Sequence, residues 1–270
     1  MMTARCAALP RAAFWSAAVL GLAAAAFPPA AHARIATTLS AGSPGLAIAQ
    51  AISNADRPAT DRARDADRKP AALLAFAGVR RGMAIADVMP GQGYFTRLFA
   101  NAVGPTGHVW AVEPAWLLEK HPGALNAMNA LAQQPSFANV SVVTRKLDAL
   151  ALPRKVDMVW TSQNYHDLYY GQSPDAALAF DKAAFAALKP GGIFMVIDHV
   201  AAPGATGDLA SLHRIDPALI RQQAEAAGFV FQAESKALAN PSDPHDKPVF
   251  DPSIRGRTDQ AILKFRKPAR

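Results

Sequence analysis

Cysteine is almost absent from this chain, and so is any long apolar run beyond the N-terminus. Among 270 residues the single cysteine is Cys6. If the N-terminal segment that contains Cys6 is removed, the remaining chain can form no disulfide, no cysteine-ligated zinc or iron–sulfur site and no thiol nucleophile. Only 18% of residues are charged and 51% are hydrophobic, which excludes an intrinsically disordered chain. The length suits one sizeable domain or two small ones.

The N-terminal segment has the three-part pattern of a secretory signal peptide. Arg5 and Arg11 precede an alanine-rich apolar stretch at residues 12–27. Two prolines end this stretch, and residues 31–33 form a small–x–small cleavage site. The stretch is shorter than the roughly 20 residues of a spanning helix, which disfavours an uncleaved membrane anchor. We therefore expect residues 1–33 to be removed and the protein to be periplasmic or secreted.

Cleavage at this site changes the composition of the chain. The removed part carries two arginines and no acid, so the mature chain has 237 residues, a formal charge of +5 instead of +7, and no cysteine. Its basic residues are interspersed with acidic ones, so we expect no nucleic-acid partner. No later stretch approaches eighteen apolar residues, so we expect no stable membrane insertion. The oligomeric state stays open.

Short apolar runs alternate with helix-like segments from residue 82 onward. We expect strands at residues 83–88, 108–113, 140–143, 156–160, 193–197, 229–234 and 261–265. We expect helices at residues 94–103, 123–134, 174–188 and 216–227, and two short helices within 59–77, where Pro70 interrupts the pattern. This alternation predicts a parallel sheet covered on both faces. No helix separates the last two strands, which predicts an antiparallel pair.

A glycine turn lies between the first strand and the first helix, at residues 89–93. Glycine lets the backbone approach a ligand closely, and parallel sheets bind ligands where their strands end. Glu113 ends the second strand, where an acid can accept both hydroxyls of a ribose. Thr96 stands where a dinucleotide fingerprint needs its third glycine, which disfavours a nicotinamide oxidoreductase. The chain also lacks the Gly-x-Ser-x-Gly of α/β-hydrolases.

These motifs resemble those of the class I S-adenosylmethionine-dependent methyltransferases, over residues 82–265. Residues 87–93 resemble the first glycine motif of that family, with Met89 where a glycine usually stands. Residues 188–192 and 227–229 resemble the sequence motifs that precede the fifth and sixth strands of that family. The motifs at residues 90–96, 165–167 and 255–259 resemble a bacterial subgroup of exported predicted methyltransferases. The resemblance implies a Rossmann-like three-layer α/β/α sandwich, whose seven-stranded and mostly parallel sheet has an antiparallel last strand.

The resemblance also implies a cofactor, S-adenosylmethionine, and a set of site residues. The residues expected to bind the cofactor are Asp87, Pro90, Gly91, Gly93, Tyr94, Glu113, Asp148 and Asn164. The expected catalytic residues are Tyr165, His166 and Asp167. Of these, His166 is the candidate for acceptor binding or a general base, and the alternative is a loop histidine bonded to backbone. His199 and His213 could face the same cleft, but their spacing matches no metal motif, so we expect no metal site.

We expect three parts along the chain. Residues 1–33 are the signal peptide, residues 34–80 are an N-terminal leader with helices, and residues 81–270 are a methyltransferase-like domain. The expected function is methyl transfer from S-adenosylmethionine to an undefined small-molecule acceptor. Because the methyl donor is made in the cytoplasm, the alternative is a non-catalytic periplasmic binding or scaffold protein with the same fold.

Overall fold

The computed structural model describes residues 43–269 of the chain. Contacts divide the chain into residues 1–38 and 39–270, and all of the described residues lie in the second unit. The signal peptide expected at residues 1–33 lies outside the described residues and stays a prediction, as does the leader up to residue 42. Within residues 43–269 no helix is long and apolar enough to cross a bilayer.

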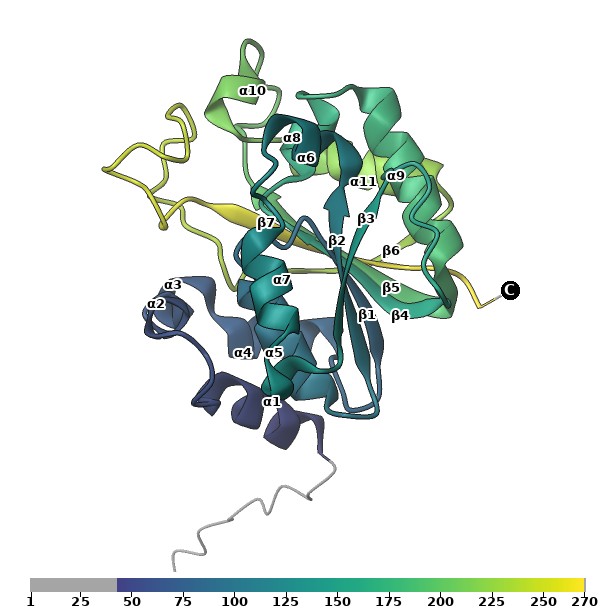
Figure 1. The fold of residues 1–270 in the computed structure, drawn as a ribbon. Helices are drawn as coiled ribbons and strands as arrows, with labels where there is room; N and C mark the ends of the chain where they lie inside the picture. The colour runs from purple at the N-terminus through teal and green to yellow at the C-terminus, as the bar shows by residue number, and fades with distance from the viewer. Residues whose placement is uncertain (1–42, 270) are drawn as a thin grey trace, which may run out of the picture. The chain divides into compact units, whose positions relative to one another are not determined.

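Seven strands form one sheet in the order β3-β2-β1-β4-β5-β7-β6 (Figure 1). The strands are β1 (Ala84–Val88), β2 (His108–Pro114), β3 (Val140–Arg145), β4 (Val156–Ser162), β5 (Leu188–His199), β6 (Val230–Ser235) and β7 (Gln260–Arg266). Strands β1 to β5 pair in parallel, and β7 runs antiparallel to both β5 and β6. The predicted mostly parallel sheet with an antiparallel last strand is confirmed.

Helices cover both faces of this sheet, which confirms the three-layer α/β/α sandwich. One apolar core lies between the sheet and α1 (Pro44–Ser53), α4 (Pro70–Ala77), α5 (Tyr94–Val103) and α7 (Asn126–Ala132). A second core lies against α8 (Tyr165–Tyr169), α9 (Pro174–Ala187) and α11 (Pro217–Ala226). Figure 1 shows these two groups of helices on opposite sides of the strands. The remaining helices are α2 (Ala59–Arg62), α3 (Asp65–Arg68), α6 (Ala115–Lys120), α10 (Leu209–Leu212) and the 3-10 turn η1 (Pro135–Phe137).

Local sequence signals account for the best-predicted elements. Helix α5 has the predicted bounds, and its apolar face brings the Phe99 ring to 5.1 Å from the ring of Trp160 in β4. This contact places Trp160 in the core, as its position inside a strand suggests. Helix α11 begins with a local cap, because the Asp216 carboxylate accepts a hydrogen bond from the Ala218 amide at 2.8 Å.

Several predictions are wrong in detail. The helix predicted over residues 123–134 begins only at Asn126, and α6, α8 and α10 were not predicted. Residues 59–77 form three short helices instead of two, because a second break at residues 63–64 adds to the one predicted at Pro70. Residues 189–192 were expected to precede the fifth strand, but they belong to the start of β5. There the backbones of Gly191 and Gly192 pair with that of Lys267 at 3.1 and 2.9 Å.

A buried arginine joins the short N-terminal helices to the sheet domain. The two terminal nitrogens of Arg57 donate to the two oxygens of Asp65, at 2.8 and 2.6 Å, and the Arg57 side chain is fully buried. The same carboxylate accepts from the Tyr94 hydroxyl at 2.6 Å. Burial works against the Asp65 charge, but the hydrogen bonds from Arg57 and Tyr94 outweigh it and lower the pKa of Asp65. One carboxylate therefore links α3 to the first residue of α5.

We predict that Asp65→Asn lowers the free energy of unfolding by about 3 kcal/mol, because it leaves the buried Arg57 charge without its partner. Urea denaturation measures the change. The exposed Asp67 lies on the same helix, so Asp67→Asn should stay within about 0.5 kcal/mol of the parent protein. Equal losses in the two variants would contradict the assignment.

Candidate functional site

Strands β1, β2, β4 and β5 are parallel, so their carboxyl ends meet at one edge of the sheet, where such folds bind ligands. Figure 1 shows α6, α8 and α10 gathered at the end to which β2 points. Three buried carboxylates belong to this region: Asp87 in β1, Glu113 in β2 and Asp198 in β5. A buried charge must be paired or neutralised, so the surroundings of each carboxylate decide what the edge can bind.

The glycine turn between β1 and α5 contains three left-handed residues. Their φ angles are 53° at Met89, 57° at Gly91 and 79° at Gly93. A Cβ added to Gly91 would have nothing within 4 Å among the described residues, so the turn is open there. A Cβ on Gly93 would lie 2.8 Å from Met128 Sδ, so this glycine lets α7 pack closely. Of the two glycines expected to bind the cofactor, Gly91 faces open space and Gly93 faces the core.

Asn164, another expected cofactor residue, connects the glycine turn to the loop after β4. Its side-chain amide donates to the Met89 carbonyl at 3.0 Å, and its side-chain oxygen accepts from the Thr161 hydroxyl. Pro90, the next residue of the turn, is half-buried. Asn164 thus holds the ends of β1 and β4 at a fixed separation, and its amide is already committed to protein groups.

The carboxyl groups of Asp87 and Glu113 differ in their partners. Asp87 accepts a hydrogen bond from the Thr96 hydroxyl at 2.6 Å. Glu113 is 1% exposed, and its Oε2 has no hydrogen-bond partner within the described part of the chain. Burial raises the pKa of both groups to about 7, and the nearby Asp87 adds to the effect on Glu113. A buried oxygen without a donor at the end of β2 can take hydrogen bonds from a ligand.

Tyr94 and Arg68 close one side of this region. The Tyr94 hydroxyl points to Asp65 and away from the turn, and the Arg68 guanidinium lies 4.6 Å from the centre of the Tyr94 ring. Arg68 also donates to the Gln163 side chain at 2.7 Å, and burial lowers its pKa to about 10. Sequence reasoning missed Arg68, because its partner is 95 residues away and no local pattern connects them.

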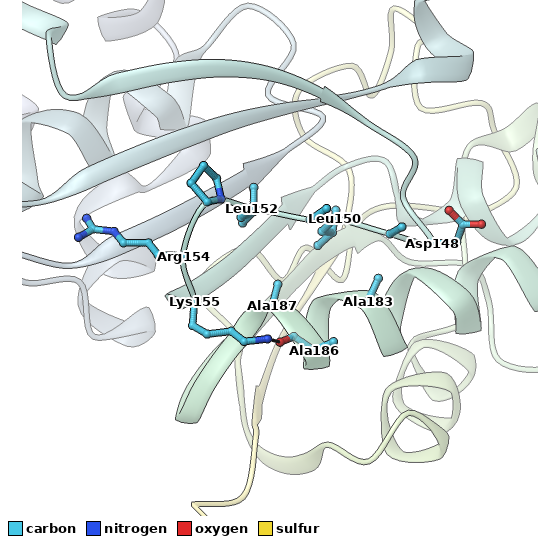
Figure 2. A pocket seen from close by; sticks show the side chains of 11 residues that line it. Asp148, Leu150, Leu152, Arg154, Lys155, Ala183, Ala186 and Ala187 are labelled. Carbon is cyan, nitrogen blue, oxygen red and sulfur yellow. Dashed lines mark hydrogen bonds between the residues drawn. The ribbon is translucent and has the colours of Figure 1, made fainter.

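Asp148 is exposed and borders two hollows. Figure 2 shows the first, of about 450 Å³, with Asp148 at one end and Arg154 and Lys155 at the other. This hollow follows the connection between β3 and β4 and the end of α9, where its lining carries no histidine. It therefore lies apart from the catalytic candidates that follow β4.

The second hollow, of about 310 Å³, lies beside the end of β2. Asp148 borders it together with Trp116 of α6, Leu147 and Leu168 of α8. Its lining begins at Ala115, two residues after Glu113. The lining also includes Glu119, and an indole, two leucines and two carboxylates can enclose a flat aromatic ring that carries a hydrogen-bond donor. Sequence reasoning did not identify Trp116, which lies on a helix that it did not predict.

His166 lies on α8, directly after β4, and Asp198 determines its orientation. The Asp198 carboxylate accepts from the His166 amide and bonds to His166 Nδ1, both at 2.8 Å. Because Asp198 also accepts from the His199 amide at 2.8 Å and has a lowered pKa, it stays ionised although it is buried. Burial disfavours the imidazolium, but the Asp198 charge outweighs this effect and raises the pKa of His166.

The second ring nitrogen of His166, Nε2, faces two further polar groups. His166 Nε2 lies 3.2 Å from His213 Nδ1, which follows α10, and 3.4 Å from the Asp167 carboxylate. The structure therefore brings His166, Asp167 and His213 together at the sheet edge. It places His199 separately, where it bonds to the Thr258 hydroxyl at 2.7 Å, and burial lowers the pKa of His199 to about 4.

Tyr165, the third expected catalytic residue, lies in the core on the α9 side of the sheet. It is fully buried, and its hydroxyl donates to Asp181 of α9 at 2.7 Å. Its ring packs near Phe180, with 6.4 Å between ring centres. The hydroxyl of Tyr165 thus anchors α8 to α9, whereas His166 and Asp167 occupy the sheet edge.

Comparisons with known proteins show which solved structures share this fold. No protein-family model matches the sequence. Over 130 residues the chain is 32% identical to a ubiquinone/menaquinone biosynthesis C-methyltransferase, UbiE, of Burkholderia vietnamiensis, and the match covers 46% of each protein. Among solved structures, it is similar to a SAM-dependent methyltransferase from Aquifex aeolicus, at 17% identity and a TM-score of 0.54, over 80% of this chain and 96% of that one. It is also similar to the [4+2]-cyclase SpnF, at 17% identity and a TM-score of 0.57, over 76% and 82%. The chain has the fold of the class I S-adenosylmethionine-dependent methyltransferases.

We predict that Gly93→Ala destabilises the protein more than Gly91→Ala does. Both changes force an alanine into a left-handed conformation, which costs about 1 kcal/mol. Only the Cβ at residue 93 also displaces the buried side chains of Met128 and Leu131, which adds about 1–2 kcal/mol. Urea unfolding of the two variants compares these costs. Equal free energies of unfolding would show that α7 does not pack against the turn as described.

Proposed function

We propose that this protein is an S-adenosylmethionine-dependent methyltransferase that acts on a small-molecule acceptor. The observation that supports this most is Glu113, whose buried Oε2 has no partner among the described residues at the end of β2. A carboxylate in that position suits the two hydroxyls of a ribose. The partial match to the Burkholderia C-methyltransferase and the shared fold support the same reading.

Each part of the cofactor has a group that fits it. Glu113 would accept hydrogen bonds from the ribose, and the open side of the turn at Gly91 would let the methionine part approach the backbone. The 310 Å³ hollow lined by Trp116 would enclose the adenine, with Asp148 accepting from its amino group. S-adenosylmethionine supplies a methyl group on a positively charged sulfur. The remaining work of the chain is to hold donor and acceptor in line.

The acceptor would bind at the edge formed by His166 and Asp167. Asp198 fixes the His166 ring through two hydrogen bonds, so Nε2 faces the edge and not the core. A group oriented in this way can bind the acceptor or take a proton from it during transfer. Arg68 would close the opposite side, because α3 carries it to Gln163 in the loop after β4.

A non-catalytic binding protein with the same fold is the competing function. Fold alone does not decide between them, because a [4+2]-cyclase also has this architecture. The unpartnered Glu113 favours a chain that binds the ribose-containing cofactor, since burying such a group without a ligand is costly. Failure to bind the cofactor product would therefore favour the non-catalytic protein.

We predict that the purified protein binds S-adenosylhomocysteine in a calorimetric titration and that Glu113→Gln weakens binding about 10- to 100-fold. The loss follows from replacing a charge-assisted hydrogen bond, worth about 1.5–3 kcal/mol, by a neutral one. Glu225→Gln, an exposed change on α11, is the control and should leave the affinity unchanged. A dissociation constant weaker than about 1 mM for the parent protein would refute the cofactor assignment.

We also predict that this affinity falls as the pH is lowered from 8 to 6. The pKa of Glu113 is raised to about 7, so the unliganded carboxyl is increasingly protonated below that pH. Accepting both ribose hydroxyls requires the ionised form, so protons compete with the ligand and affinity drops by up to about tenfold per pH unit. Titrations at several pH values measure the slope. If Glu113→Gln retains the same slope, the titrating group is not Glu113.

A further inference from the structure

Three ligand atoms converge at the sheet edge beside α8 and α10. They are His166 Nε2, His213 Nδ1 and a carboxylate oxygen of Asp167, Oδ1. Their separations are 3.2 Å between the two nitrogens, 3.4 Å from His166 to Asp167, and 3.6 Å from His213 to Asp167. Two histidines and one carboxylate are a common ligand set for divalent transition metals.

The three distances agree with a tetrahedral metal centre. Zinc binds histidine nitrogen at about 2.0–2.1 Å and carboxylate oxygen at about 2.0–2.2 Å. Two ligands of a tetrahedron with these bond lengths lie about 3.4 Å apart, which is the middle of the observed range. One ion can therefore contact all three atoms without movement of the backbone.

Hydrogen bonds within the cluster do not satisfy all three groups. The buried Asp198 carboxylate only accepts, so one hydrogen of the His166 ring lies on Nδ1, and in the neutral ring, which is the form that binds a metal, Nε2 presents a lone pair. That lone pair faces an Asp167 oxygen at 3.4 Å, and the oxygen also presents lone pairs. The His213 nitrogen can donate to His166 at 3.2 Å, but 3.6 Å to Asp167 is too long for a hydrogen bond. A cation between the three atoms removes this repulsion.

The surroundings are those of a metal site that retains a free position. A carboxylate behind a histidine ligand fixes its tautomer and strengthens it, which is the arrangement of Asp198 and His166. The His213 ring packs against Phe250 at 4.8 Å between ring centres, and its backbone is left-handed, with φ at 53°. The side chains of His213 and Asp167 are 34% and 42% exposed, so solvent or another ligand can reach the open side.

We propose that His166, His213 and Asp167 bind one divalent transition-metal ion, such as Zn²⁺. Three protein ligands leave a fourth position for water or another oxygen or nitrogen atom. The sequence-based expectation of no metal site rested on spacing along the chain, whereas these ligands meet only in three dimensions. In this arrangement His166 holds the ion and does not itself take a proton from the acceptor. That last consequence depends on the proposed function, and metal binding does not.

The test is a titration of the full protein with Zn²⁺, without a histidine tag and after chelator treatment and dialysis. We expect one ion per chain with a dissociation constant in the micromolar range or below. His213→Ala should weaken binding by at least about a hundredfold, since it removes one of three ligands, and Asp167→Asn by at least about tenfold. His213 is partly exposed, and circular dichroism checks that the variant is folded.

His245→Ala is the matched control, because His245 pairs with a single carboxylate, Asp259, at 3.1 Å. It should bind zinc as the parent protein does. Cobalt absorption gives a second readout, because intense visible bands indicate four-coordinate geometry. The proposal is overturned if the parent protein binds no stoichiometric zinc, or if His213→Ala binds zinc with unchanged affinity. The titration contains no S-adenosylhomocysteine, so its outcome is separate from that of the cofactor test.

Discussion

One buried carboxylate, that of Asp198, fixes the side chains at the sheet edge beside α8. A charge at the end of a central strand is tolerated only when hydrogen-bond donors surround it. Asp198 has three: the amide and Nδ1 of His166 and the amide of His199. Two of these donors belong to His166 on α8, so the Asp198 carboxylate at the end of β5 also fixes the helix that follows β4. The orientation of His166, and with it the direction of Nε2, follows from this requirement.

Glu113 is also a buried carboxylate, but its surroundings differ from those of Asp198. Its carboxyl is as buried as that of Asp198, but its Oε2 has no donor within residues 43–269. The pKa consequently rises to about 7, whereas that of Asp198 falls. Asp198 is satisfied by its own chain and is suited to positioning, and Glu113 is left for a ligand to satisfy. Asn164 connects the two regions, because it bonds to Met89 in the turn and lies two residues before His166.

The sequence predicts the sheet well and the side-chain partners poorly. Apolar runs bounded by glycine and proline specify the strands and α5, because those signals are local. Residues 189–192 were left out of the fifth strand, since the pairing of Gly191 and Gly192 with Lys267 involves a distant part of the chain. Tyr165 and Asp167 were assigned to one site because residues 165–167 resemble a single motif of the methyltransferase subgroup. Two positions along a helix differ by about 200°, so Tyr165 turns to Asp181 in the core while Asp167 faces the edge.

Met89 shows how the turn keeps its shape without the usual glycine. A left-handed φ of 53° at a methionine costs about 1 kcal/mol and persists only where the surroundings impose it. Here the Met89 amide donates to the Val112 carbonyl at 2.9 Å, and the Met89 carbonyl accepts from Asn164 at 3.0 Å. Both backbone groups are held, so the conformation depends on hydrogen bonds and not on the freedom of glycine. The strain therefore lies two residues before the open Gly91, in the turn that is proposed to bind the cofactor.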